Sequence, residues 1–136
     1  MPTDNIAIAR RWFQEVWNDR NENTIDELVL PNSICHADDG SITGPEEFKD
    51  RLWKPFLAAF PDIRVTIEDV LSCGDHVVVR WSASGKHTGK GLGVEPTDQQ
   101  ATLTGMTWTR YENGKMVEGW QCSNIPEVVR MIRGAT

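Results

Sequence analysis

The stretch from Thr102 to Asn124 constrains the fold most strongly, because it reads as two long alternating segments joined by a tight turn. Asn113 and Gly114 form that turn, and both residues tolerate the positive φ that a two-residue hairpin requires. In an extended segment, side chains two positions apart point to the same face. The sequence TLTGMTWTRYENGKMVEGWQCSN therefore predicts a long β-hairpin with two chemically distinct faces.

One face of this predicted hairpin combines large apolar side chains with polar ones. The residues that we expect on it are Met106, Trp108, Arg110, Glu118, Trp120, Cys122 and Asn124. Such a mixture is typical of a small-molecule pocket. The alternative is an ordinary core strand, but a core rarely places unpaired charges beside its tryptophans. We therefore expect this face to line a cavity, with Arg110 or Arg80 near its polar end.

Composition limits the classes of function that fit the chain. Its 136 residues predict a single domain over residues 1–136, and the net charge of −6 argues against nucleic acid or an anionic membrane as the main partner. The sequence contains no apolar run that predicts a signal peptide or a membrane span. The three cysteines have no CxxC spacing, which favours free thiols in a cytoplasmic protein.

Periodic apolar residues predict three helices before the strands. The first runs from about Asp4 to Asp19, with Thr3 or Asp4 as its cap. The second opens with Thr24-Ile25-Asp26-Glu27, which has the pattern of a capping box, and it stops at Pro31. The third begins at Pro45 and runs toward Phe60, with Pro55 expected to kink or split it.

The second half of the chain alternates in the manner of strands. Residues 63–70 and 76–85 predict two antiparallel strands, although the pattern leaves open which face of 76–85 meets the cavity. The glycine-rich segment 86–100 predicts a lid or rim, since it lacks the GxxxxGK[ST] pattern of a phosphate-binding loop. Residues 126–133 predict a final short helix. Helices segregated from a strand meander indicate an α+β fold, with a strongly bent sheet wrapped around the long helices and a conical cavity between them.

The polar segment 32–43 raises the question of a metal site. His36 with Asp38 and Asp39 resembles the beginning of a ligand set, but His76 and His87 are the other histidines and neither has ligand spacing to the other. We therefore expect no bound metal. His36 remains a candidate pocket residue.

Four stretches in series carry a resemblance to a known family. They are GPEEFK at 44–49, AAFPDIRVTIEDV at 58–70, GDHVVVRWSASGKHTG at 74–89 and YENGKMVEGW at 111–120. Together they resemble the SnoaL-like polyketide cyclase family of the nuclear-transport-factor-2-like superfamily. The resemblance implies a cone-shaped α+β barrel, in which N-terminal helices pack on a strongly curved, mostly antiparallel sheet around an internal cavity. It also implies a homodimer formed through the sheet, and an aldol ring closure on an aromatic polyketide ester without a metal or organic cofactor.

The same resemblance places an acidic catalytic residue just after the hairpin. In this chain that position falls at Asn124, with Gln121 as the alternative. An amide cannot exchange a proton at ordinary pH, although it can donate to a carbonyl or developing enolate oxygen. The proton would then move through another group, and the candidates are His36, His87, Asp38 and Glu118.

Two functions of different classes follow. The first is a cofactor-independent cyclase-like lyase or isomerase acting on a hydrophobic carbonyl compound. The second is a non-catalytic binding protein that uses the same aromatic pocket. The residues expected to be catalytic are Asn124, Gln121 and His36, and those expected to bind the ligand are Met106, Trp108, Arg110, Trp120, Arg80, His87, Phe56 and Trp17.

Overall fold

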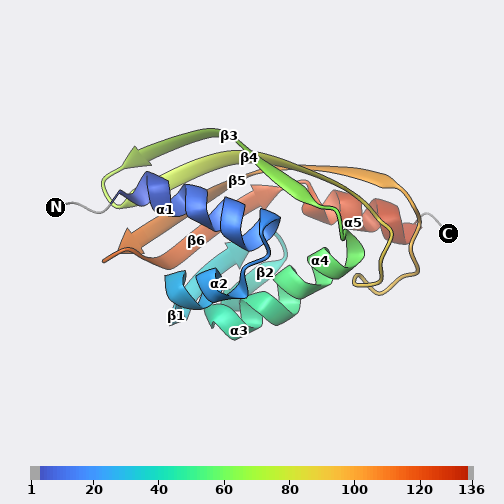
Figure 1. Ribbon diagram of the computed structural model, residues 1–136, viewed down its shortest axis with the longest axis horizontal. Helices are drawn as coiled ribbons and strands as arrows, with labels where there is room; N and C mark the ends of the chain where they lie inside the picture. Colours follow the sequence, from blue (N-terminus) through green and yellow to red (C-terminus); the bar gives the residue numbers. More distant parts are fainter. Residues whose placement is uncertain (1–3, 135–136) are drawn as a thin grey trace.

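The computed structural model describes residues 4–134 and consists of helical segments packed on one six-stranded sheet. The elements in chain order are α1 (Asn5–Arg11), η1 (Trp12–Asn18), α2 (Glu22–Leu28), β1 (Val29–Ala37), β2 (Gly40–Thr43), α3 (Gly44–Phe48), η2 (Lys49–Trp53), α4 (Lys54–Ala59), β3 (Arg64–Cys73), β4 (His76–Lys86), β5 (Gln100–Glu112), β6 (Lys115–Ser123) and α5 (Ile125–Gly134). The η segments are π-helical and continue the α-helices beside them. Helices α1 to α4 lie on one side of the sheet, and α5 follows the end of β6 (Figure 1).

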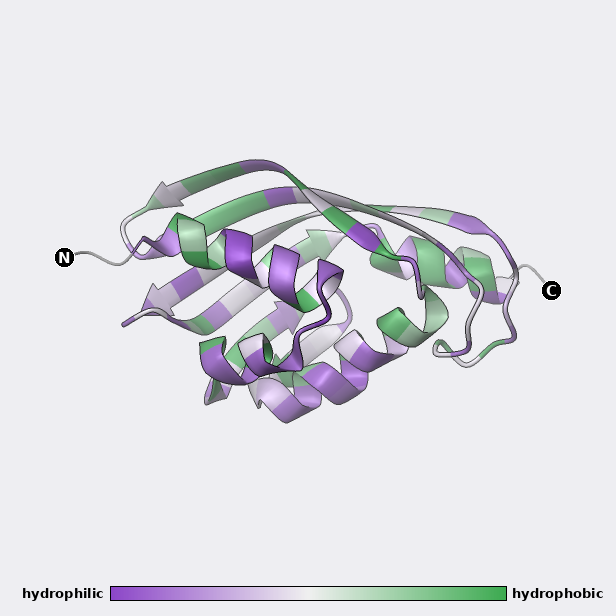
Figure 2. Ribbon diagram, in the orientation of Figure 1, coloured by the Kyte–Doolittle hydropathy of each residue, from purple (hydrophilic) through white to green (hydrophobic). Residues whose placement is uncertain are grey.

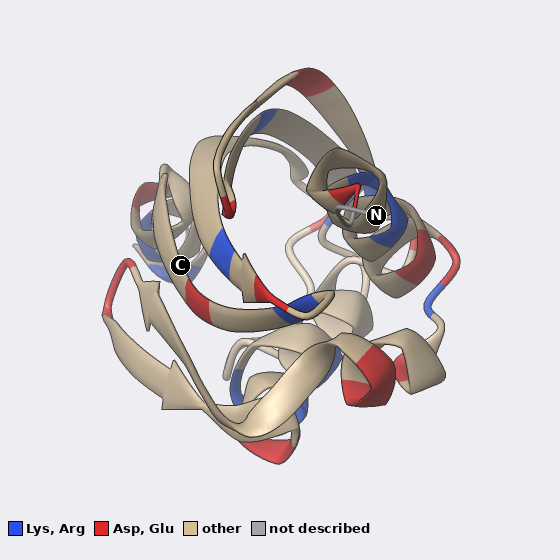
Figure 3. Ribbon diagram, turned by 90° about the vertical axis from the view of Figure 1, so that its left-hand side faces the viewer, with Lys and Arg blue, Asp and Glu red and all other residues tan. Residues whose placement is uncertain are grey.

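The sheet has the strand order β2-β1-β6-β5-β4-β3. Its described pairs are antiparallel apart from β1 and β6, which run parallel. Seen end-on, the strands curve around the helices (Figure 3). The predicted α+β fold with a curved, mostly antiparallel sheet is confirmed. The sheet is open, since β2 and β3 form separate edges.

The first helix begins where the sequence predicts. The Asp4 carboxylate accepts a hydrogen bond from the backbone N–H of Ala7 at 3.1 Å, which identifies it as the cap. Thr3, the alternative cap, lies outside the described residues. Trp53 ties this helix to the third one, because its indole N–H donates to the carbonyl oxygen of Val16 at 2.9 Å.

The predicted capping box at Thr24 is wrong. Helix α2 starts three residues earlier, and its cap is Asn21, whose side-chain oxygen accepts from the backbone N–H of Asn23 at 3.1 Å. Arg20 adopts a φ of 58°, so the chain has already turned when it reaches Asn21. Thr24 therefore lies inside the helix, where its hydroxyl donates to Glu15 at 2.7 Å.

The third helix is divided as its prolines predict. Pro45 occupies the first turn of α3, and Pro55 occupies the first turn of α4. Between them the helix widens into the π-helical turn η2. Proline lacks a backbone donor and its ring clashes with the preceding turn, which accounts for the division at Pro55.

The β5–β6 hairpin is confirmed, with Asn113 and Gly114 at φ values of 50° and 76°. The β1–β2 hairpin was not predicted, because segment 32–43 is polar and one face of it is exposed. Hydrophobic and hydrophilic residues alternate along β3 and β4 (Figure 2). On β4 the buried face carries Val77, Val79, Trp81 and Ala83. The core therefore lies between the concave face of the sheet and the helices.

Candidate ligand-binding site

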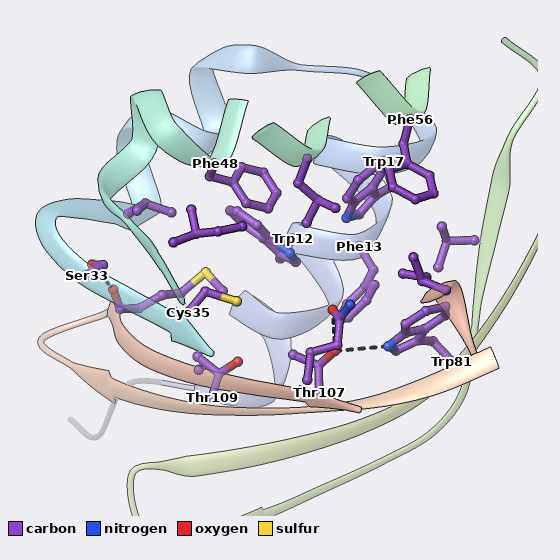
Figure 4. A pocket seen from close by; sticks show the side chains of 18 of the residues that line it. Trp12, Phe13, Trp17, Ser33, Cys35, Phe48, Phe56, Trp81, Thr107 and Thr109 are labelled. Carbon is purple, nitrogen blue, oxygen red and sulfur yellow. Dashed lines mark hydrogen bonds between the residues drawn. The ribbon is translucent and has the colours of Figure 1, made fainter. Parts of the chain in front are cut away.

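A cavity of about 110 Å³, here called the inner cavity, lies between the helices and the concave face of the sheet. Its aromatic wall comes mainly from the helices (Figure 4). The aromatic residues that line it are Trp12, Phe13, Trp17, Phe48, Phe56 and, from β4, Trp81. Trp12 and Phe48 pack at 5.2 Å between ring centroids, and Trp17 meets Phe48 edge-on at 6.2 Å. Aromatic side chains therefore make up much of the wall of the inner cavity.

The sheet side of the inner cavity consists of smaller residues. Strands β4 to β6 contribute Ala83, Leu103, Thr107, Thr109 and Gly119 to the lining. Gly105 shows why large side chains do not fit on this face: a Cβ there would lie 2.6 Å from the Trp81 ring and 2.9 Å from the carbonyl oxygen of Cys122. Because the helices already fill the interior with aromatic rings, the facing strand positions must be small to leave an open space.

A short hydrogen-bond relay crosses the floor of the inner cavity (Figure 4). The indole N–H of Trp81 donates to the hydroxyl oxygen of Thr107 at 2.9 Å. The Thr107 hydroxyl then donates to the side-chain oxygen of Gln121 at 3.4 Å. This arrangement holds the Gln121 amide oxygen against the wall, and the Gln121 amide nitrogen has no hydrogen-bond partner within residues 4–134. The floor thus presents a neutral donor to whatever occupies the space.

Cys35 and Glu118 are the titratable residues of the described lining. Burial, together with the nearby charge of Asp38, raises the pKa of the Cys35 thiol to about 11. Glu118 contributes to the lining, but its carboxylate pairs with the ring nitrogen Nε2 of His36 at 2.7 Å. Ser33 is also occupied, since its hydroxyl donates to the carbonyl oxygen of Met116. Among the described lining residues, Gln121, Thr107 and Thr109 are the polar groups best placed to meet a ligand.

Four of the residues that the sequence analysis assigned to the pocket line the inner cavity. They are Trp17, Phe56, Glu118 and Gln121. The sequence analysis did not assign Trp12 or Phe48 to the pocket, and it left open whether the face of 76–85 that carries Trp81 meets the cavity. The apolar stripes of the first and third helices already contained Phe13 and Phe48, so the helical period was the signal that could have identified them.

The hairpin residues expected in the pocket lie on the other face of the sheet, and the face assignment is corrected accordingly. Met106, Trp108 and Trp120 are 54%, 49% and 39% exposed and do not line the inner cavity. Trp108 and Trp120 are direct cross-strand neighbours, so they project together from the convex side, here called the outer face. Alternation determined that these residues share a face but not which face the helices cover.

Two polar residues that were predicted for the pocket, Arg110 and Arg80, also lie on the other face of the sheet. Arg110 pairs with Glu112 at 3.0 Å, and Arg80 lies directly across from Met106, so both belong to the outer face. His36 is also there: its ring stacks on Trp120 with centroids 5.6 Å apart.

Asn124 and His87 are held by the backbone of the fold outside the inner cavity. The Asn124 side-chain oxygen accepts from the backbone N–H of Thr104 at 2.9 Å, and its amide nitrogen donates to the carbonyl oxygen of Thr102 at 3.2 Å. Asn124 therefore fastens the end of β6 to β5. His87 is fully buried, and its Nδ1 accepts from the backbone N–H of Thr97 at 3.2 Å, which anchors the glycine-rich loop.

Within residues 4–134, no three His, Cys, Asp or Glu side chains are arranged to hold a metal ion. Cys35, Cys73 and Cys122 are free thiols. In the same described range, no helix is both long and apolar enough to cross a membrane.

The fold is similar to the folds of several solved structures. The chain matches a provisionally assigned SnoaL-like polyketide cyclase from Jannaschia sp. CCS1 with a TM-score of 0.83 and 24% identity, covering 94% of this chain and 90% of that one. It matches IdmH, a provisionally assigned polyketide cyclase from Streptomyces antibioticus, with a TM-score of 0.79 and 24% identity, over 97% and 99% of the two chains. AclR, a provisionally assigned hydroxylase from Streptomyces galilaeus, matches with a TM-score of 0.82 and 22% identity, over 98% and 82%. These likenesses establish the fold.

The sequence itself identifies the family. A comparison with curated proteins finds none that matches the chain. The family model described as SnoaL-like polyketide cyclase matches residues 7–130, which is nearly the whole chain. With the aromatic cavity, the curved sheet and this match in agreement, the chain belongs to the SnoaL-like polyketide cyclase family.

Proposed function

We propose that this protein binds a hydrophobic carbonyl compound in the inner cavity and that Gln121 donates a hydrogen bond to the carbonyl oxygen. The observation that carries the proposal is the amide of Gln121 on an otherwise largely apolar wall, with its oxygen held by Thr107. A ligand whose carbonyl oxygen reaches this half-buried N–H donor gains a hydrogen bond in a largely apolar space, so a ligand that brings an acceptor is favoured. The aromatic wall supplies the apolar contact.

An amide donor at this position also has a chemical consequence. Negative charge develops on a carbonyl oxygen when the neighbouring carbon loses a proton or when a nucleophile adds to it, and a fixed N–H donor stabilises that charge. The amide does not remove the proton itself, because it does not titrate in range. The site is therefore suited to binding and polarising a carbonyl group.

Membership of the cyclase family favours a second function, turnover of the bound compound by a cofactor-independent cyclase or a related lyase or isomerase. Enclosing walls can hold a flexible chain folded so that its reacting carbons meet, which lowers the entropic part of the barrier. Of the proton acceptors suggested by the sequence, Glu118 pairs with His36 and Asp38 binds Ser123. His87 does not line the inner cavity. In this second function the proton leaves to water or to a basic group of the compound itself.

A pair of matched ligands tests the primary proposal. We expect 2-acetylnaphthalene to quench tryptophan fluorescence at lower concentration than 2-ethylnaphthalene, by about fivefold, because one neutral hydrogen bond contributes about 1 kcal/mol. Gln121→Leu should abolish the preference and leave 2-ethylnaphthalene binding unchanged. Gln100→Leu, the same change on an exposed residue outside the cavity, is the control. Equal affinity for the ketone and the hydrocarbon in the unaltered protein would overturn the role of Gln121.

Deuterium exchange separates binding from turnover. Ethyl benzoylacetate in deuterated buffer loses its acidic protons at a rate that NMR measures directly. An enzyme accelerates that loss above the buffer rate, and Gln121→Leu then slows it, whereas a binding protein leaves it at the buffer rate. Gln121→Asp should increase exchange in either case, since burial in an apolar space raises the pKa of a carboxyl group toward the range of a useful base.

We also propose that the protein is a homodimer joined through the outer face. Met106, Trp108 and Trp120 form an exposed apolar group on adjacent strands, directly paired at Trp108 and Trp120. Exposed aromatic clusters of this kind mark protein interfaces. A second copy of the chain is the occupant that the family resemblance implies.

A further inference from the structure

A second, larger cavity adjoins the inner one. It has a volume of about 810 Å³ and lies between the third helix, the glycine-rich loop and α5. The two cavities share the wall residues Ile42, Leu52, Phe56, Gln121 and Ile125. A ligand that extends past Phe56 from the inner cavity therefore enters this outer space, here called the mouth.

The rim of the mouth is preformed by close backbone packing. Gly91 of the glycine-rich loop lies so near α4 that a Cβ there would be 2.2 Å from the carbonyl oxygen of Pro55. On the other side, Arg133 of α5 donates through Nε and Nη2 to the carbonyl oxygen of Leu92, at 3.1 and 3.0 Å. The loop is thus fixed to both α4 and α5, and Arg133 serves as a structural clamp.

Positive charge is concentrated at the mouth, although the whole chain has a net charge of −6. Arg51, Arg130 and Arg133 line it, with Asp38 and Asp39 as the acidic residues. Both carboxylate oxygens of Asp38 are occupied, because the backbone N–H and the hydroxyl of Ser123 donate to them at 2.8 and 2.6 Å. Asp38 keeps its negative charge, so the lining of the mouth carries three arginines against two carboxylates, one of which is already hydrogen-bonded within the fold.

The arginines of the mouth differ in how many of their N–H donors are already engaged in hydrogen bonds. Arg51 shares its Nη1 between Glu47 at 3.1 Å and the carbonyl oxygen of Ser41 at 3.2 Å. Arg130 is exposed, and no hydrogen bond or ion pair engages it within residues 4–134. An arginine presents a planar fork of donors that matches a carboxylate. Arg130 is therefore the donor with the most unused capacity, and Arg51 supports it from the opposite wall.

We propose that the mouth binds a carboxylate carried by the ligand, with Arg130 as its main partner and Arg51 as a second. The ligand class becomes an aromatic ketone or ester with an acidic side chain: the apolar body fills the inner cavity, the carbonyl meets Gln121, and the chain passes Phe56 to the mouth. This inference rests on the proposed function, because it assumes that the inner cavity holds the apolar body. It adds the charge of the ligand and the residues that select it.

The test compares 4-(2-naphthyl)-4-oxobutanoic acid with its primary amide, which keeps the ketone but removes the charge. At low salt we expect the acid to bind about tenfold more tightly, the effect of one partly exposed charge-assisted pair. Arg130→Gln should remove most of the preference for the acid and leave amide binding unchanged. Arg51→Gln should lower it by a smaller factor. Arg10→Gln, on the exposed surface of α1 and outside both cavities, is the control.

The possible results distinguish failure of the carboxylate site from failure of the proposed function. Equal affinity for acid and amide, or an acid preference that survives Arg130→Gln together with Arg51→Gln, would overturn the carboxylate site. If 2-acetylnaphthalene still bound more tightly than 2-ethylnaphthalene, the role of Gln121 would stand. Failure of all four compounds to bind would reject the ligand-binding cavity, and the carboxylate site with it.

Discussion

Trp81 and Trp108 lie on neighbouring strands of one sheet, yet they have opposite surroundings. Trp81 is 6% exposed and points into the inner cavity, where its indole N–H donates to Thr107. Trp108 is 49% exposed on the outer face, where its indole N–H donates to the ring nitrogen Nδ1 of His76 at 2.8 Å. Both polar atoms are satisfied, so hydrogen bonding does not distinguish the two positions. What differs is which other part of the molecule covers the ring.

The two faces of the sheet obtain their apolar side chains from different elements and use them differently. On the inner face the helices supply most of the aromatic rings, and the strands opposite them supply small residues such as Gly105 and Thr109. On the outer face the strands themselves carry the exposed apolar residues Met106, Trp108 and Trp120. The inner face therefore stabilises the protomer and shapes the cavity. We assign the outer face to the proposed contact with a second copy.

Truncating one tryptophan on each face should show the largest difference between the two faces. Trp81→Ala should lower the free energy of unfolding by about 3–5 kcal/mol, because it removes a buried ring and leaves a cavity. Trp108→Ala should cost the isolated protomer about 1 kcal/mol or less, since half of the ring already contacts solvent. Urea unfolding at high dilution measures both. Similar losses from the two variants would contradict the division.

A charge on the outer face should affect assembly and leave the cavity intact. Trp120→Lys should weaken the proposed dimer at least 30-fold, because a central interface tryptophan commonly contributes 2 kcal/mol or more. Light scattering distinguishes the dimer from a 15.3 kDa protomer, and 2-acetylnaphthalene binding reports whether the cavity survives. Met131→Lys, an exposed apolar residue on α5, is the matched control. A protein that is monomeric at micromolar concentration before any substitution would refute the assembly.

The sequence predicted the elements better than it predicted their faces. The turn at Asn113-Gly114, the proline at the start of α3 and the division at Pro55 rest on local backbone restrictions, and all are found in the structure. The capping box failed because Asn21, another good cap, lies nearby and begins the helix first. Local chemistry offered two caps, and the preceding turn selected between them.

The candidate site was harder to predict because it depends on contacts between distant segments. Period-two spacing correctly grouped Met106, Trp108 and Trp120, but only the position of the helices decides which face is inside. Gln121 was an alternative in the sequence and Asn124 the first choice. The register of β6 against β5 places Gln121 opposite Thr107, so Gln121 lines the cavity and Asn124 does not.

The reactivity of the three thiols should also differ between the two faces. Cys35 lines the inner cavity, whereas Cys122 is exposed and pairs across the strands with Met106 on the outer face. Burial raises the pKa of Cys35 from 9.0 to about 11, so at pH 8 its reactive thiolate is scarce. We expect iodoacetamide to modify Cys35 about tenfold more slowly than Cys73, and the rate to increase as the pH rises toward 11.

Ligand and protein concentration should then act on different cysteines. Saturating 2-acetylnaphthalene should slow the modification of Cys35 several-fold and leave Cys122 unchanged, because the ligand fills the space beside the first thiol alone. Raising the protein concentration should slow Cys122 and leave Cys35 unaffected, because the proposed dimer covers the outer face. Mass spectrometry of the peptides resolves the three sites. Protection of Cys122 by the ligand, or of Cys35 by concentration, would mean that the two faces are not independent.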